Sequence, residues 1–279
     1  MPTFDTPDPL DAHIVNAAGD ITVIAGDTAT TTVEVTANDE RDRETAEQTT
    51  VEMSGQRLTI EVPRQHGLAH TPEIDIRVTV PSHSSVQVEA ASTDTTLTGD
   101  FDAVRVRTAS GDVRLDTVAG PLTVETASGD VSLDEARGPV QINTASGDVR
   151  LVSALGDDPV EVSTASGDAE IGSVHGPLTV NVASSDIRAR EAAADVSVSS
   201  ASGDVTLDHV HTGKVGVSTA SGDVRVGIAT GVLTWLDLRS LSGDIGTDQA
   251  DGNGPADGEA TLELRANTVS GDIRLHRVG

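Results

Sequence analysis

The sequence predicts an all-β protein, a single-stranded β-solenoid (β-helix) of about ten coils of 18–21 residues with a β-rich N-terminal cap. Three observations support this fold class. A short tripeptide recurs at a nearly constant spacing, aliphatic and polar residues alternate on both sides of it, and aromatic residues are almost absent. Because Phe4, Phe101 and Trp235 are the only aromatic residues, the core must be aliphatic.

The tripeptide is Ser-Gly-Asp or a close variant. Its successive serines are separated by 18, 18, 18, 20, 18, 18, 19, 21 and 28 residues. A repeat this short cannot bury a core alone, so neighbouring repeats must stack. The serines are Ser92, Ser110, Ser128, Ser146, Ser166, Ser184, Ser202, Ser221, Ser242 and Ser270.

Apolar residues hold fixed positions in each repeat, six and four residues before the serine and three and five after it. In the second repeat these are Val104, Val106, Val113 and Leu115. The alternation predicts two short strands per coil. A glycine, often followed by proline as at 120–121, predicts the opposite corner, because glycine permits positive φ and proline restricts the entry of the next strand.

Residues 1–85 are predicted to form a β-rich cap that is continuous with the solenoid of residues 86–279. Strand-like alternation runs through the cap, and Ala18-Gly19-Asp20 resembles a degenerate corner. We expect surface loops at 38–48 and 64–72, and a loop insertion at 246–259. The C-terminal end of the solenoid is expected at 275–279, beyond the last corner.

The repeat resembles a known family. Thr-Ala-Ser-Gly-Asp-Val at 108–113, 126–131 and 144–149, together with the strand–proline–strand passage that begins at 74–81, is similar to the putative-adhesin family of bacterial β-strand-repeat proteins. The resemblance covers nearly the whole chain. It implies a β-solenoid and an adhesin label, and it supplies no reaction and no catalytic residues.

Composition excludes several functions. With 18 basic against 45 acidic residues, the net charge of −27 repels nucleic acids and anionic membranes. The absence of cysteine removes disulfides, thiolate catalysis and cysteine-bound metals. The N-terminus has no signal-peptide pattern and no apolar run is long enough to span a membrane, so we expect a cytoplasmic protein without a transmembrane segment.

The acid after each corner glycine is the most suggestive chemical feature. Stacking would align Asp112, Asp130, Asp148 and Asp168 about one strand spacing apart. One hypothesis is a cation-responsive acidic rod, because Ca²⁺ prefers several oxygen ligands. The hypothesis we favour is structural: each aspartate accepts backbone N–H bonds at its own corner.

Two other functions were weighed. Threonine arrays can order water, but Thr126 and Ser128 continue the inward alternation of their strand, which argues against an ice-binding face. A degenerate carbohydrate-active β-helix remains an alternative. No catalytic motif and no cofactor-binding motif is present, so we expect no enzyme activity and no cofactor.

Trp235 has the outward parity of its strand and is the candidate interaction residue. We expect the 246–259 insertion to cover it, which favours a monomer over an end-on dimer. The sequence therefore predicts a non-enzymatic scaffold or adhesin-like interaction protein, with a protein or cell-envelope component as partner.

Overall fold

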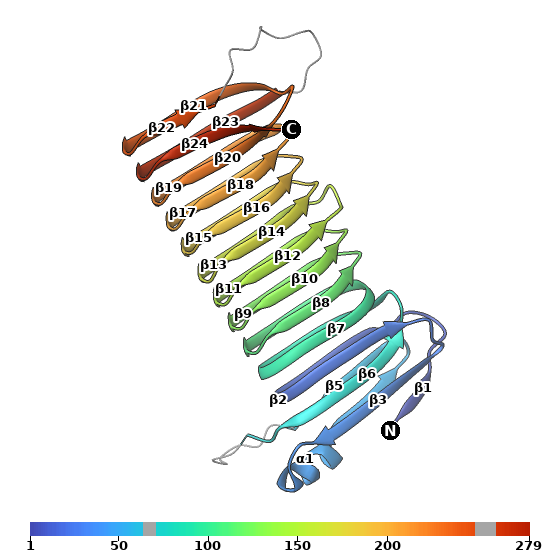
Figure 1. Cartoon of the computed structure of the whole chain (residues 1–279). Coiled ribbons are helices and arrows are strands. Elements are labelled where there is room, and N and C mark those ends of the chain that lie inside the picture. Colours follow the sequence, from blue (N-terminus) through green and yellow to red (C-terminus); the bar gives the residue numbers. More distant parts are fainter. Residues whose placement is uncertain (64–70, 249–260) are drawn as a thin grey trace. The chain divides into compact units, whose positions relative to one another are not determined.

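The computed structural model describes residues 1–63, 71–248 and 261–279, and most of them are in β-strands. They form two compact units, Met1–Gly138 with Ile142–Thr144, and Pro139–Gln141 with Ala145–Gly279. Parallel strands stack coil on coil within each unit (Figure 1). The predicted β-solenoid is therefore confirmed in both.

The first unit contains the cap and the first regular coils. Its elements are β1 (Thr3–Asp5), β2 (Asp11–Gly26), β3 (Thr30–Ala37), a 3₁₀ turn η1 (Glu40–Asp42), α1 (Arg43–Gln48), β4 (Thr50–Ser54), β5 (Arg57–Glu61), β6 (Ile74–Pro81), β7 (Ser84–Ser110), β8 (Val113–Val118), β9 (Leu122–Ser128) and β10 (Val131–Ala136).

The long strand β2 is itself a coil, and Gly19 forms its corner with φ of 105°. One edge of β2 pairs in parallel with β7, and the other pairs with β5 and β6. Antiparallel pairs surround this core: β1 with β3, β3 with β6, and β4 with β5. The cap is thus joined to the first coils by continuous parallel pairing through β2.

The loop expected at 38–48 is wrong, because η1 and α1 lie there. The Asp39 carboxylate accepts the backbone N–H of Arg41 and caps the turn. The sequence Arg-Glu-Thr-Ala-Glu-Gln that follows is rich in residues that favour helix. Most of the second expected loop, 64–70, lies outside the described residues.

The second unit consists of regular coils. After β11 (Val140–Ser146), which contains the boundary, its strands are β12 (Val149–Ala154), β13 (Val160–Ser166), β14 (Ala169–Val174), β15 (Leu178–Ser184), β16 (Ile187–Ala192), β17 (Val196–Ser202), β18 (Val205–Val210), β19 (Gly213–Ser221), β20 (Val224–Ala229), β21 (Leu233–Ser242), β22 (Ile245–Thr247), β23 (Thr261–Ser270) and β24 (Ile273–Val278).

Equivalent residues of successive coils stand side by side. Leu178 pairs with Val196 and Val196 with Val215, and each of the three is at most 2% exposed. The polar residues between them face outward. These internal columns confirm the alternation predicted from the sequence, and each fully buried Val or Leu contributes about 1.5–3 kcal/mol relative to an exposed one.

The order of the C-terminal coils differs from the order in the chain. The last coil, β23 and β24, lies between the coil of β19 and β20 and the coil of β21 and β22 (Figure 1). The expected C-terminal end at 275–279 is therefore wrong. The coil that ends the stack is β21–β22.

A physical reason for this order lies in the second strand of each coil. The six residues of β24 pair along the whole of β20 and continue its apolar column with Leu275. By contrast, β22 has three residues and places Thr247 in that column. An incomplete coil leaves part of its neighbour uncovered, so it fits only at the end of a stack. Gly246 and Thr247 of the expected insertion belong to β22, and 249–259 lies outside the described residues.

Two features of the Ser-Gly-Asp corner favour glycine, its positive φ and the close approach of the neighbouring coil. Gly203 has φ of 128°, and a Cβ on it would lie 2.0 Å from the carbonyl oxygen of Ser185 in the preceding coil. Any side chain would therefore be strained and would also collide with the stacked backbone. Thr93 and Ser185 replace the glycine at two corners, and at the second of these the Ser185 hydroxyl accepts the backbone N–H of Gly167 at 2.8 Å.

Val198→Asp should destabilise the second unit by about 3 kcal/mol or more, because it places an unpaired carboxylate in a dry aliphatic column. Val198 is 1% exposed. Ser197→Asp is the matched control: it introduces the same group one residue away, on the exposed face, between Thr179 and Gly216. Thermal and urea unfolding measure both, and equal stability of the two variants would contradict the assigned faces.

Candidate functional site

The corner aspartates form a continuous hydrogen-bonded ladder within each unit. In each step the backbone N–H of one corner aspartate donates to the carboxylate of its counterpart in the preceding coil, at 2.8 to 3.0 Å. The capping hypothesis is thus right about the donor group, but the donor belongs to the next coil and not to the same corner. The steps are Asp112 to Asp94 and Asp130 to Asp112 in the first unit, and Asp168 to Asp148, Asp186 to Asp168, Asp204 to Asp186, Asp223 to Asp204, Asp272 to Asp223 and Asp244 to Asp272 in the second.

Arginines neutralise part of this ladder. Arg114 contacts the second carboxylate oxygen of Asp112 at 2.8 Å, and Arg225 contacts both Asp204 at 3.3 Å and Asp223 at 2.9 Å. Each exposed pair contributes little to stability, yet together they offset the repulsion between stacked carboxylates. Within the described residues, no group of three or more histidine, aspartate or glutamate side chains is placed to hold a metal ion.

Asp20 belongs to the same ladder in the cap. Its backbone N–H donates to Asp75 at 2.9 Å, and its register partner on the other side is Asp94. Partial burial, followed by repulsion from the carboxylates of Asp75, Asp94 and Glu73, raises the pKa of Asp20 above its usual value of 3.8. At this position, therefore, burial and the neighbouring acids together disfavour the charged form of the carboxyl group.

The threonines of the Thr-Ala-Ser corner serve the backbone. Thr126 is 8% exposed and its hydroxyl donates to the carbonyl oxygen of Ser128 at 3.1 Å. Thr108, Thr164 and Thr219 make the same bond. Ser128 itself is exposed, so its expected inward orientation is wrong, because the chain has already begun to turn there. The buried threonines form no exposed array of the kind that ice binding requires.

Trp235 lies on the outer face of β21 and is 54% exposed, as its parity predicts. The guanidinium of Arg265 lies 5.5 Å from the centre of its ring, within the range of a cation–π contact, and also pairs with Glu263 at 2.7 Å. A cavity of about 730 Å³ opens beside the ring across β19, β23 and β21, and Lys214, the only lysine, lines it.

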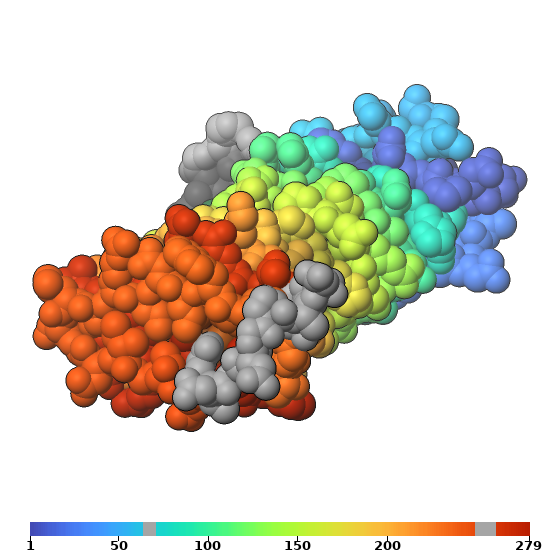
Figure 2. Space-filling view, turned by 90° about the horizontal axis from the view of Figure 1, so that it is seen from above, coloured from blue at the N-terminus to red at the C-terminus, as the bar shows by residue number. Residues whose placement is uncertain are grey.

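More apolar side chains are exposed on the same two coils. Leu241 is 84% exposed, Val269 is 53% exposed and Ile245 is 45% exposed. Leu241 and Val269 precede the corner serine, where the other eight repeats all have alanine. The C-terminal coils, which face the viewer in orange and red in Figure 2, therefore carry a concentration of large apolar side chains.

The outermost coil also has a free edge. In the part of the chain that the structure describes, β21 pairs only with β23, and β22 pairs only with β24. The column residues of this coil are only partly covered: Leu236 and Leu238 are half-buried, whereas Leu264 and Ala266 beside them are 0% exposed. We call Trp235, Leu241, Ile245, Val269 and the outer edge of β21 the terminal surface.

Of the residues in the terminal surface, only Trp235 is predicted from its sequence position as an interaction residue. Aligned columns contain the signal for Leu241 and Val269, because both break an otherwise constant alanine position. Arg265 could not be paired with Trp235 from the sequence, because the contact depends on the last coil lying inside the preceding one.

Parallel coils, internal aliphatic columns and the aspartate ladder define a β-solenoid repeat protein with an open, partly apolar terminal coil. The chain belongs to the Toastrack DUF4097 family, whose model matches residues 70–176 and again residues 173–278. The resemblance carried by the repeated Thr-Ala-Ser-Gly-Asp-Val motif is thereby confirmed.

The chain is also similar to several solved structures. A putative adhesin from Parabacteroides distasonis has a TM-score of 0.40 at 11% identity, and one from Bacteroides fragilis has a TM-score of 0.36 at 12% identity; each comparison covers 99% of this chain and 95% of the other. A putative lipid binding protein from Parabacteroides distasonis has a TM-score of 0.33 at 13% identity, over 100% and 96% of the two chains.

No curated protein matches the sequence. Among the described residues, no helix has the length and apolar character needed to cross a membrane.

Asp186→Asn should leave stability nearly unchanged, because the amide oxygen can still accept the N–H of Asp204, now 2.8 Å from the carboxylate. Asp186→Ala should cost about 1 kcal/mol, because it leaves that donor without its acceptor. Urea unfolding measures the stability of both variants. Thermal unfolding with and without calcium then distinguishes the structural hypothesis from the cation-binding hypothesis for the aspartate ladder. A calcium-induced rise in Tm of the parent protein that disappears in Asp186→Asn would contradict the structural role.

Asp20→Asn should stabilise the first unit at neutral pH, because it removes a carboxylate whose folded-state pKa is raised. As pH rises above about 3.8, the unfolded chain releases its proton first, so the parent loses stability until the pH passes the raised folded pKa. The advantage of the variant should therefore be full at neutral pH and absent below pH about 3. Unfolding at several pH values measures it, and an advantage that grows on acidification would be inconsistent with this account.

Proposed function

We propose that the protein is a non-catalytic, adhesin-like interaction scaffold that binds a protein partner through the terminal surface. The observation that carries the proposal is the free edge of β21 beside exposed Trp235 and Leu241. The stacked coils hold this edge and its apolar side chains in a fixed arrangement.

The free edge favours a polypeptide as partner. Unpaired backbone N–H and C=O groups on an edge strand are satisfied best by another backbone, which adds as a further strand. A partner that covers this edge also buries Leu236, Leu238 and Ile245, whose equivalents in inner coils are buried. Backbone pairing and apolar burial thus act on the same partner segment.

Trp235 and Arg265 are suited to anchor that segment. Tryptophan and arginine dominate the energetics of many protein interfaces, and an aromatic ring already held by a guanidinium loses little freedom on binding. The cavity beside the ring provides room for one side chain of the partner. Lys214, Arg265, Asp195 and Glu263 line the cavity, so it offers both charged donors and charged acceptors to a polar side chain.

The corner residues support a non-catalytic role. Aspartates and threonines that repeat along the coils are engaged with backbone groups of neighbouring residues, so their repetition has a structural cause. The protein–protein function therefore rests on the terminal coil, where the repeat pattern changes.

The proposal is tested with Trp235→Ala combined with Leu241→Ser. The parent, immobilised through its N-terminus, should capture one discrete protein from an extract of the native organism, and a photocrosslinker placed at Val269 should label that protein. The double variant should lose both signals. Val152→Ser, which removes an exposed apolar side chain (41% exposed) from an inner coil, should retain them.

Light scattering of the purified protein identifies the alternative occupant. A parent dimer that the double variant dissociates would mean that a second copy covers the terminal surface. Capture that is unchanged in the double variant would contradict the proposal.

A further inference from the structure

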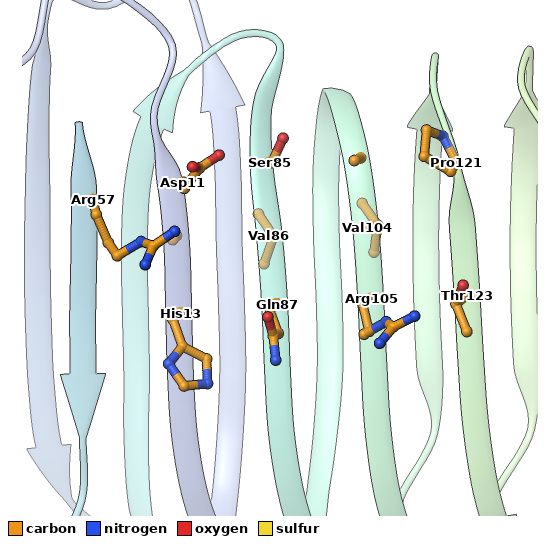
Figure 3. Close-up of a pocket in the computed structure, with 12 residues that line it drawn as sticks. Asp11, His13, Arg57, Ser85, Val86, Gln87, Val104, Arg105, Pro121 and Thr123 are labelled. Atoms are coloured by element: carbon orange, nitrogen blue, oxygen red, sulfur yellow. The ribbon is translucent and has the colours of Figure 1, made fainter.

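A second candidate binding site lies in the first unit, on the outer face of the sheet formed by β5, β2, β7 and β9. A groove of about 440 Å³ opens there, at the end of the sheet where Pro121 precedes β9. Figure 3 shows the strand that carries Ser85 and Gln87 between the strand of His13 and the strand of Arg105. The groove therefore crosses several neighbouring strands.

The charge of this groove is opposite to that of the chain. Arg57, Arg105 and His13 line it together with one acidic residue, Asp11. In the whole chain acidic residues outnumber lysine and arginine by 45 to 18. Basic side chains thus outnumber acidic ones among the groove's lining residues, although Glu89 lies 3.7 Å from His13 at its border.

The two arginines are also free of acidic partners. Among the described residues, neither Arg57 nor Arg105 lies within ion-pair distance of a carboxylate, whereas Arg107, two residues further along the same face, pairs with Glu125 at 3.1 Å. For Arg105 the difference follows from the register, because Arg107 stands beside Glu125 and Arg105 stands beside Thr123. Arg57 stands beside Asp11 on β2, but no ion pair joins the two side chains. The donors of Arg57 and Arg105 remain available to a ligand.

The positions of Arg57 and Arg105 determine how far apart the anionic groups of a ligand must be to contact both. The guanidinium of Arg57 extends over β2, near Asp11 and His13, while Arg105 lies beyond the strand of Val86 (Figure 3). Strands in a sheet are about 4.8 Å apart, so these two positions are separated by roughly 10 Å. One small anion cannot contact both, but a ligand with two acidic groups can.

Polar groups lie between the two arginines, and no phenylalanine, tyrosine or tryptophan is among the residues that line the groove. Ser85 and Thr123 offer hydroxyl groups, and Gln87 is held by its hydrogen bond to Glu89 at 3.1 Å. Without the large ring of a phenylalanine, tyrosine or tryptophan, recognition of a ligand here depends mainly on charge and hydrogen bonds. Guanidinium groups match the planar geometry of carboxylates and the oxygens of phosphates.

We propose that this groove binds a polar ligand that carries at least two oxyanion groups roughly 10 Å apart, one at Arg57 and one at Arg105. This site is independent of the terminal surface, which lies in the other unit. The chemistry is shared by acidic oligosaccharides, whose anions are carboxylates, and by linear polyphosphates.

Isothermal titration calorimetry at physiological salt tests the proposal with four probes. Tetragalacturonate and a linear hexaphosphate carry several oxyanions along an extended chain; monomeric galacturonate and inorganic phosphate carry one. At least one extended probe should bind about tenfold or more tightly than its monomer, because the second arginine contact is then added. The extended probe that binds identifies the source of the anions.

Variants locate the site. Arg57→Gln and Arg105→Gln should each weaken binding of the extended probe about tenfold, whereas Arg107→Gln should change it by less than about twofold, because Glu125 already occupies that guanidinium. All three side chains are exposed, so the variants should unfold at the same temperature as the parent.

Side-chain NMR signals of Gln87 and His13 provide a second measurement, and should shift on addition of the extended probe. Absence of binding by both extended probes would overturn the proposal. Equal losses in the three variants, or a monomer that binds as tightly as its extended form, would overturn it as well.

Discussion

Every residue of a regular coil stands beside its own counterpart one strand spacing away, and the rest of the structure depends on this constraint. Each position must tolerate a copy of itself on both sides. Aliphatic side chains meet it by packing into columns such as Leu178–Val196–Val215. Glycine meets it at Gly203, where the backbones of two coils approach too closely for a Cβ.

Charged residues meet the same constraint less easily, and the corners show how it is resolved. A column of identical carboxylates would repel itself, yet each carboxylate that accepts an N–H from the next coil gains a partner through that same stacking. Where an arginine follows two residues later, as at Asp112 and Arg114, the second oxygen is neutralised too. At Asp20, partial burial and then the nearby carboxylates of Asp75, Asp94 and Glu73 raise the pKa.

Stacking also explains how much the sequence could predict. Aligned columns predict which residues of β13 to β20 face the core, where the glycine corners lie and that Trp235 is exposed. They do so because equivalent positions of successive repeats have the same environment. The order of the last coils did not follow, since β21 and β23 carry the same column pattern and either could continue β19. Only the short β22 distinguishes them, and its pairing requires the structure.

The candidate sites lie where the repeat fails. At the terminal surface, Leu241 and Val269 replace alanine, a change visible in the sequence once the columns are aligned. The groove of Arg57 and Arg105 was not predictable, because it depends on the register between β2, β5 and β7 in a region where the repeat has degenerated. Residues that follow the repeat have a packing role, and the residues that depart from it are the candidates for binding.

The reversed order of the last two coils has a consequence for biosynthesis. A ribosome delivers residues 233–247 before residues 261–278, yet β23 and β24 occupy the place beside β19 and β20. The nascent chain therefore cannot complete its stack coil by coil in the order in which the coils emerge. Residues 233–247 can take their final place beside β23 and β24 only after residues 261–278 have been made, although they precede them in the chain.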